Sequence, residues 1–600
     1  MQKYFLSGLA VLMAVSSMAG ASLTAEDLDR RRKALSDLLS EQWEYTLRTN
    51  PEFASLLGDK RFNDKSSEIS TAAIERDLMT NRRFLKQFEA IDTTGFSEQE
   101  VLNKALIVRN LHDAIEDTTW KEYEMPVSQM DGIHLFAAQL PALLSFTTAK
   151  EYDDYVARMR NFPAQIEGTI DFMRRGMRDR LMPPKFLLEK VAAQADGIAG
   201  QPPDKSPFAL PLANVPDSIS EADRTRIRAA FLDAIQNSVL PAYKRFAAFV
   251  HDEYAPRGRT QVGVWSLPDG LKRYDVHIRH VTTTNLTAEE IHAIGLREVA
   301  RIEAEMLQIA KQLGFNDLKS LNQAIDANPD LRAKSREQIL DLYRQYEDQM
   351  YAQLPKLFGR LPKAKLVVVP VEAFREKEAA GADYTPGAAD GSRPGRINVN
   401  TSDPPSRKTI SMESTAYHEG VPGHHMQISI AQELSDLPQF RRQGGYTAYV
   451  EGWALYTERL GKEVGFYRNP YNDYGRLQDE MLRAIRLVVD TGLHAKKWTR
   501  EQVVQFFHDH SAVDEVDVQN ETDRYIVWPG QALGYMIGQL KIVELRERAR
   551  KDLGDRFDIR EFHDQILGAG ALPLVVLEKR IADWITRAST TSATGSAARD

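Results

Sequence analysis

The chain has 600 residues, of which 42% are apolar and 27% are charged. A chain of this length and composition can bury a large hydrophobic core, which excludes a disordered or fibrous protein. The formal net charge is −8, and acidic and basic residues are interspersed along the chain. Nucleic-acid binding requires a basic region that this pattern lacks, so we expect no nucleic-acid partner.

The N-terminus has the layout of a secretory signal peptide. An early lysine precedes an apolar run at residues 5–15, and a small-x-small cleavage site follows at 19–21. The run is shorter than the ~20 apolar residues of a membrane-spanning helix. We expect residues 1–21 to be removed, which leaves an exported protein, periplasmic or secreted, without stable membrane insertion. The chain contains no cysteine, so any metal must be held by His, Glu or Asp.

Helical periodicity dominates the rest of the sequence. At 287–313 apolar residues recur at helical spacing, and Thr287 and Glu290 have the spacing of a capping box. Similar patterns predict further helices at 24–48, 69–90, 97–116, 151–177, 219–250 and 334–356. Strands are predicted at 365–371 and 396–401, joined by a turn-rich segment.

Composition suggests how the chain is divided. The proline-rich segment 200–218 is the best candidate for a boundary between two lobes. This predicts an N-terminal helical region at 22–205 and a second helical region at 206–587, which contains the motif described next. Residues 588–600 are dominated by small and polar residues, which predicts a disordered tail.

One short stretch, YHEGVPGHHMQI at 417–428, points to metal chemistry. Zinc-binding helices of peptidases commonly carry His-Glu-x-x-His, in which two imidazoles one turn apart share a face. Here His418 and Glu419 are present, but Pro422 stands where the second histidine would be. On an unbroken helix, His418 and His424 would lie about 9 Å apart along the axis and about 120° apart around it. One ion could not bridge them, so a metal site requires the helix to be broken.

The same stretch contains a helix breaker at the required place. Pro422 cannot donate a hydrogen bond to the carbonyl of His418, and two glycines flank it. If two residues leave the helical count, His424 becomes the second ligand; if three do, His425 takes that role. Glu419 would then be the general base. The alternative is that these histidines merely surround a proline kink.

A third ligand is expected on the helix predicted at 446–460. Glu451 and Glu458 lie on one face two turns apart, and Gly452 would allow another backbone to approach closely. We favour Glu451 and leave Glu458 open, while either could be an ordinary solvated carboxylate. Two imidazoles and one carboxylate favour a single Zn²⁺, although Mn²⁺ or Co²⁺ would fit the same ligands.

Several blocks of the sequence resemble a known family. ESTAYHEGVPGHHMQ, YVEGWALYTERLGKEVGFY, VDTGLHAKKWTREQ and RYIVWPGQALGYMIGQLKI resemble the bacterial "domain of unknown function 885" family, and the resemblance extends over nearly the whole mature chain. That family is usually taken to be helical, zincin-like and related to metallopeptidases. The resemblance implies metal ligands at His418, His424 and Glu451, with Glu419 as the base.

Other positions are candidates for catalytic groups. Asp490 and His494 are four apart on a predicted helix, so a carboxylate-oriented imidazole could contact the substrate carbonyl or support the metal site. A helix expected to start at Pro529 carries Gln531 and Tyr535, also four apart. The Tyr535 hydroxyl could stabilise an oxyanion, and Gln531 could contact substrate. For each, the alternative is ordinary packing.

Arginine side chains are candidates for holding a peptide carboxylate. They are Arg524, with its neighbour Tyr525, and Arg393 in the turn-rich segment. His425 is a further substrate-binding candidate if it is not a ligand. The alternative for these residues is packing or loop structure.

Taken together, the sequence predicts a mainly α-helical fold: a zincin-like, two-lobed helical body with a deep cleft and a small β-sheet near the metal site. The predicted function is zinc-dependent hydrolysis of short peptides, by a metallopeptidase of the oligopeptidase or carboxypeptidase type. An extended peptide could pair with the strand predicted at 396–401. The alternatives are a metal-dependent amidase or esterase acting on small exported molecules, or a non-catalytic binding protein.

Overall fold

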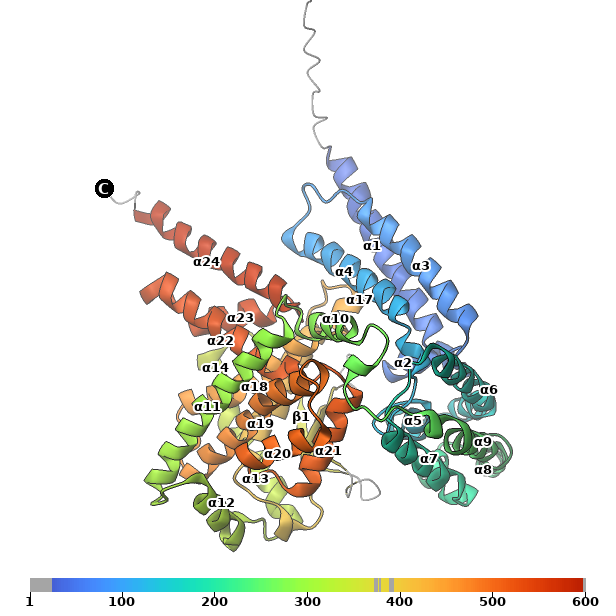
Figure 1. Ribbon diagram of the computed structural model, residues 1–600. Helices are drawn as coiled ribbons and strands as arrows, with labels where there is room; N and C mark the ends of the chain where they lie inside the picture. The colour runs from blue at the N-terminus through green and yellow to red at the C-terminus, as the bar shows by residue number, and fades with distance from the viewer. Residues whose placement is uncertain (1–23, 372–375, 377–378, 388–392, 597–600) are drawn as a thin grey trace, which may run out of the picture.

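The computed structural model describes residues 24–371, 376, 379–387 and 393–596. Within them the protein is mainly α-helical with one small sheet, as predicted (Figure 1). The expected signal peptide at 1–21 lies outside the described residues. No helix in the described part of the chain has the length and apolar character needed to cross a bilayer.

The N-terminal helices, blue to dark green in Figure 1, lie on the right of that view. A small core joins the first, third and fourth helices through residues such as Phe84, Phe88 and Leu111. A second core joins the next five helices through residues such as Met159, Phe231 and Tyr243. The helices are α1 (Ala25–Thr49), α2 (Pro51–Leu56), α3 (Thr71–Glu89), α4 (Glu98–Trp120), α5 (Ile133–Leu143), α6 (Ala149–Asp179), α7 (Lys185–Ala199), α8 (Glu221–Ala234) and α9 (Leu240–Phe249).

The proline-rich segment does not separate two cores, contrary to the predicted boundary at residue 206. It contains a 3₁₀ segment whose Phe208 packs on Phe162 and Tyr243 of the second core. That core extends to Ala255, because α8 and α9 fold back onto α6 and α7. Apart from Leu106 and Leu187, the next and largest core takes its buried residues from Val264 onward.

The C-terminal helices enclose the largest core. α18 and α19 run through it; α11 packs along α19, and α22 packs along α18. The helices are α10 (Gly270–Thr282), α11 (Ala288–Gln312), α12 (Leu318–Ala327), α13 (Arg336–Tyr351), α14 (Leu354–Leu357), α15 (Met412–Glu419), α16 (His424–Glu433), α17 (Gln439–Arg442), α18 (Thr447–Glu463), α19 (Pro470–His494), α20 (Arg500–His510), α21 (Glu515–Val527), α22 (Leu533–Leu553), α23 (Ile559–Leu567) and α24 (Leu574–Ser596).

Most of the predicted helices are confirmed within a few residues. In α11, Glu290 N–H donates to the Thr287 hydroxyl at 3.2 Å and Thr287 N–H donates to the Glu290 carboxylate at 2.8 Å, so the capping box is present. At the other end of the chain, α24 runs to Ser596. Residues 588–596 are therefore helical, where the sequence predicts a disordered tail.

The sheet contains β1 (Leu366–Pro370), β2 (Ala382–Thr385) and β3 (Gly395–Val399) in the order β1-β3-β2. β3 pairs in parallel with β1 and antiparallel with β2. The prediction treated β2 as part of a turn, because four residues followed by Pro-Gly carry little strand signal. The prediction that β3 receives a peptide is wrong, because strands occupy both of its edges.

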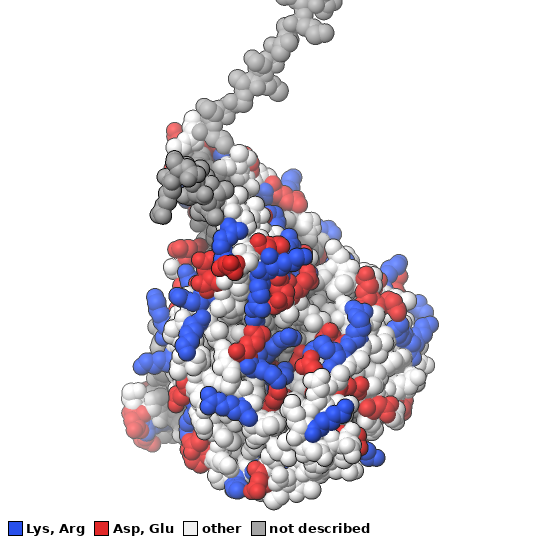
Figure 2. All heavy atoms as spheres, turned by 90° about the vertical axis from the view of Figure 1, so that its left-hand side faces the viewer, with Lys and Arg blue, Asp and Glu red and all other residues white. Residues whose placement is uncertain are grey.

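Charged side chains of both signs are mixed over the face of the molecule drawn in Figure 2, with no continuous basic region on it.

Candidate metal centre

The chain leaves the helix between the two histidines of the motif, as predicted. α15 ends one residue after His418, and α16 begins at His424. Pro422 lies in the connecting turn and follows a cis peptide bond. A Cβ on Gly423 would overlap the carbonyl oxygen of His418, so the tight turn requires glycine there. The second histidine thus reaches the first through a four-residue turn, 420–423, where the sequence predicts that two residues leave the helix.

Two neighbouring helices hold this turn in place. From α18, the indole N–H of Trp453 donates to the Pro422 carbonyl at 2.8 Å. From α13, a Glu347 carboxyl oxygen accepts from the Val421 N–H at 3.0 Å. Glu347 is buried, which raises the pKa of its carboxyl well above the usual range. A Cβ on Gly420 would overlap that carboxyl group, so a larger residue there would have to displace the Glu347 side chain.

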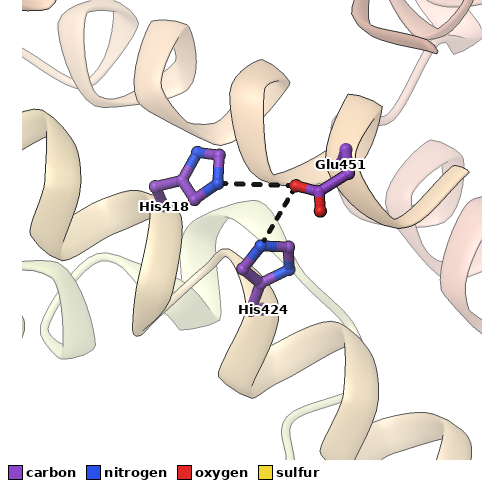
Figure 3. Close-up of side chains that lie close together, drawn as sticks. All are labelled: His418, His424 and Glu451. Atoms are coloured by element: carbon purple, nitrogen blue, oxygen red, sulfur yellow. Dashed lines mark ion pairs between the residues drawn. The ribbon is translucent and has the colours of Figure 1, made fainter. Parts of the chain in front are cut away.

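His418, His424 and Glu451 converge on one point (Figure 3), with His418 buried and the other two side chains half-buried. Glu451 Oε2 lies 3.8 Å from His418 Nε2 and 3.4 Å from His424 Nε2, and the two rings are nearly perpendicular at 88°. Two atoms bound to one tetrahedral Zn²⁺ at about 2.0–2.1 Å lie about 3.3 Å apart. The two distances to Glu451 therefore lie within about 0.5 Å of that spacing, and all three donor atoms lie within 4.8 Å of one another.

Glu458, the alternative third ligand, occupies a different place. Its Oε1 lies 2.7 Å from His418 Nδ1, on the opposite side of the ring from Glu451. Burial would lower the pKa of His418, but the hydrogen bonds to Glu451 and Glu458 outweigh it and raise that pKa to about 10. Burial would raise the pKa of Glu451, but His418 and His424 hold it well below its usual range.

Glu419 is half-buried beside this set. Burial raises the pKa of its carboxyl, and the positive charges of His418 and His424 offset only part of that effect. Asp383 on β2 acts in the same direction as burial, so the sheet lies close to Glu419. The sequence analysis missed Asp383, because nothing in a turn-rich segment indicates that it returns to the motif helix.

His425 points away from the cluster. Its ring is fully buried, and its Nδ1 lies 3.0 Å from the Tyr384 hydroxyl of β2. It therefore joins α16 to the sheet, and the predictions of a second ligand or a substrate contact at His425 are wrong. Arg393 also acts on the Tyr384 hydroxyl. Burial raises the pKa of that hydroxyl, and the positive charge of Arg393 opposes the rise.

His494 and Asp490 are structural. Both ring nitrogens of the fully buried His494 bond to backbone: Nδ1 accepts from Val264 N–H at 3.0 Å, and Nε2–H donates to Tyr525 C=O at 2.9 Å. Asp490 accepts from the Tyr274 hydroxyl at 2.6 Å instead of binding His494. The predicted catalytic role of His494 is therefore wrong.

Arg524, Gln531 and Tyr535 form a second polar cluster. Arg524 Nη2 donates to Gln531 Oε1 at 2.8 Å and to the Tyr535 hydroxyl at 3.3 Å. α22 begins at Leu533, so Gln531 lies in the preceding turn and not in a helix that starts at Pro529.

Two charged residues of this second cluster, Arg486 and Glu521, were not predicted from the sequence. Arg486 on α19 and Arg524 on α21 both bind Glu521, with N–O distances of 2.9 and 3.1 Å. Burial would raise the pKa of Glu521, but the two guanidinium groups hold it at about 2. Tyr525 is fully buried and donates its hydroxyl to Glu521, so the prediction that it binds substrate is wrong. The available signal was Arg486 itself, a charge between the apolar pairs Ala484-Ile485 and Leu487-Val488.

Comparisons with known proteins identify relatives but no activity. A family model described as "Bacterial protein of unknown function (DUF885)" matches residues 51–581. The chain is similar to a solved structure described as "the putative lipoprotein from Colwellia psychrerythraea", with 28% identity, a TM-score of 0.87, and 93% of this chain and 99% of that one covered. A "putative lipoprotein of unknown function from Shewanella oneidensis" shares the fold at 18% identity and a TM-score of 0.69, with 91% and 99% of the two chains covered. No curated protein matches the chain.

Proposed function

This protein is a member of the DUF885 family, and on that premise we propose that it is a zinc-dependent peptidase acting on short peptides. The observation that carries the proposal is the convergence of two imidazole nitrogens and one carboxylate oxygen within 4.8 Å. His418, His424 and Glu451 would hold the ion, and Glu419 would act as general base.

The donor set fits a catalytic metal. Two imidazoles and a carboxylate, with a fourth position left for water or substrate, form a common catalytic zinc site, and Mn²⁺ or Co²⁺ accept the same donors. When bound, the ion would acidify a water molecule and polarise a substrate carbonyl. Behind His418, Glu458 fixes the ring so that Nε2 faces His424 and Glu451.

Glu419 supplies the proton transfer in this proposal. It adjoins a ligand histidine in the chain, and its raised pKa suits a carboxylate that takes up a proton and releases it within one cycle. Glu419 would accept the proton of the attacking water and deliver it to the leaving amine. Tyr535 would donate a hydrogen bond to the oxyanion.

The proposed substrate is a short extended peptide. β2 is an edge strand among the described strands and packs against α15, which carries His418 and Glu419. A peptide could add to β2 by backbone pairing and place its scissile bond near Glu419. We also propose that the body is zincin-like and two-lobed with a deep cleft. The peptidase would be of the oligopeptidase or carboxypeptidase type.

Export belongs to the same proposal. One relative at 28% identity is described as a "putative lipoprotein", and lipoproteins are exported proteins. The printed chain has a signal-like N-terminus and no cysteine to carry a lipid. We propose a periplasmic or secreted protein that begins at or near Ser22, which N-terminal sequencing of exported material would test.

The test of the catalytic reading is Glu419→Gln. A general base contributes typically 10²- to 10⁴-fold to rate and forms no metal bond. The variant should keep its zinc and its thermal unfolding temperature while losing about that much cleavage in a short-peptide library. Wild type stripped with a chelator serves as control. Full activity of Glu419→Gln, or of the metal-free wild type, would overturn the proposal. Ester and amide substrates in the same assay would identify an esterase or amidase.

A further inference from the structure

The polar cluster on α21 and α22 points to a role beyond holding substrate. We infer that Arg524 and Arg486 are positioning residues for Tyr535, which fix its ring and leave its hydroxyl proton free to bind an oxyanion. This inference rests on the proposed peptidase function and adds to it the groups that orient the oxyanion donor.

The first support is the hydrogen bonding of the Tyr535 hydroxyl. Arg524 Nη2–H donates to its oxygen at 3.3 Å, so the oxygen acts there as an acceptor. A phenol has a single proton to donate. Among the described residues, no carbonyl or carboxylate accepts that proton, and the side chain is only half-buried. The proton is therefore available to a ligand.

The second support is the position of the ring. Arg486 Cζ lies 4.7 Å from the centroid of the Tyr535 ring, within the range of a cation–π interaction. Arg486 is itself fixed, because its Nε donates to Glu521 and to the Tyr525 hydroxyl, both at 3.2 Å. The ring therefore rests on a rigid, buried guanidinium group.

The third support is the charge around the hydroxyl. Glu521 bridges both arginines, so one carboxylate balances two guanidinium groups. The local balance is one positive charge in excess, counted over Arg486, Arg524 and Glu521. Fixed positive charge beside a hydrogen-bond donor stabilises negative charge that develops on a substrate oxygen.

The same contacts argue against the sequence-based role for Arg524. Its Nη1 binds Glu521 at 3.1 Å, and its Nη2 binds both Gln531 and Tyr535. A guanidinium group has five donors in a fixed fork. Three of these donors are engaged by protein and the Nε–H is buried, so Arg524 has no accessible pair of donors with which to grip a carboxylate. Its contacts suit orientation of Tyr535 and not capture of a substrate terminus.

Helix packing joins the helix that carries Tyr535 to the helix that carries Glu451. α22 and α18 run in the same direction and touch at Gly538 and Gly452, where a Cβ on either would overlap the other helix. Tyr535 lies one turn before Gly538, and Glu451 directly precedes Gly452. The two side chains therefore project from neighbouring turns of helices in backbone contact.

α19 makes a second connection between the two clusters. Arg483 Nη2 lies 3.9 Å from Glu458, the residue that orients His418. Arg483 and Arg486 are three residues apart, so they are neighbours on one face of α19. Arg483, which lies beside the carboxylate that orients His418, and Arg486, which holds the Tyr535 ring, are thus one turn of α19 apart.

The experiment is a double-mutant cycle with zinc-loaded protein and a short peptide found by library digestion. Tyr535→Phe should lower kcat by about 10²- to 10³-fold, the usual effect of losing an oxyanion donor. Arg524→Gln should lower kcat by about 10- to 100-fold with KM nearly unchanged, as for other outer-shell supports. The double variant should lose no more than Tyr535→Phe alone, because both changes remove one function. Arg524→Lys should restore part of kcat.

Two results in this cycle would overturn the inference. One is additive losses in the double variant, which would mean that Arg524 acts without Tyr535. The other is a rise in KM at constant kcat for Arg524→Gln, which would mean that it binds substrate. Arg548→Gln, an exposed site on α22 paired with Asp552, is the matched control and should leave both constants unchanged.

An activity-independent measurement separates this inference from the proposed function. In protein labelled with ¹³C at tyrosine Cζ, the Tyr535 signal is assigned by its loss in Tyr535→Phe. Arg524→Gln should shift that signal, because it removes the hydrogen bond to the phenol oxygen, while Arg548→Gln should not. An unshifted signal overturns the inference. If the signal shifts but the protein binds no metal and cleaves no peptide, the proposed function is contradicted. The contact between Arg524 and Tyr535 is still supported in that case.

Discussion

Oε1 of Glu458 lies 2.7 Å from Nδ1 of His418, on the edge of the imidazole opposite the nitrogen that faces Glu451. This contact fixes which nitrogen of His418 is free to bind a metal. Ligand histidines usually have such a partner, and its removal typically costs 10- to 100-fold in metal affinity or activity. The role of Glu458 can therefore be tested by a substitution that leaves all three proposed metal ligands in place.

Glu458→Gln should weaken zinc binding by about 10- to 100-fold without abolishing it, because the amide cannot reproduce the charge behind the ring. The measurement is a competition titration against a chromophoric chelator. Glu463→Gln is the matched control on α18, since Glu463 pairs with Arg546 and not with His418. Equal affinities of Glu458→Gln and wild type would remove Glu458 from the site.

His424→Ala and Glu451→Ala should each abolish stoichiometric metal binding, because each removes an atom of the converging set. His425→Ala should retain the metal, since its ring bonds to Tyr384 and not to the cluster. Elemental analysis of purified protein decides between them. Metal loss in His425→Ala with retention in His424→Ala would contradict the assignment of the second ligand.

Metal affinity should rise with pH. In the metal-free protein His418 has a pKa of about 10, so at neutral pH it carries a proton that an incoming ion must displace. The apparent binding constant should increase about tenfold per pH unit above neutrality and level off near pH 10. Calorimetry in two buffers of different ionisation enthalpy should show about one proton released per ion at pH 7.5. A titration without proton release would contradict this picture.

The same proton stabilises the metal-free fold. A histidine whose folded pKa is raised contributes stability that is complete below the unfolded value of about 6.5. That contribution is lost as the pH rises through about 10. Denaturant unfolding of metal-free wild type should therefore show falling stability over this range, and His418→Ala should show a smaller fall.

Gly538→Ala should lower the free energy of unfolding by about 1 to 3 kcal/mol, because its Cβ would overlap the Ala448 carbonyl oxygen at the α18–α22 contact. It should also reduce metal affinity by displacing α18, which carries Glu451. Gly197→Ala on α7 is the control: a Cβ there meets nothing within 4 Å. That change should stabilise the protein by about 0.5 to 1 kcal/mol. Urea unfolding compares the two variants, and equal effects would contradict the close helix contact.

Several features followed from the sequence because local chemistry decides them. The capping box of α11 depends on two residues three apart, and the helix break depends on the missing N–H of Pro422. The close approach at Gly452 followed from the absence of a side chain. The family resemblance added the ligand set His418, His424 and Glu451, which the structure brings together.

Other features were decided only by tertiary structure, because they depend on residues far apart in the chain. Whether Glu451 or Glu458 faces both histidines is set by how α18 crosses α15 and α16, and seven-residue spacing gives both the same helix face. His425 turns to the sheet because Tyr384 offers it a hydroxyl. His494 is structural because the backbone of Val264 and Tyr525 meets both of its nitrogens. A sequence pattern records which groups are available, whereas packing determines which partner each buried group finds.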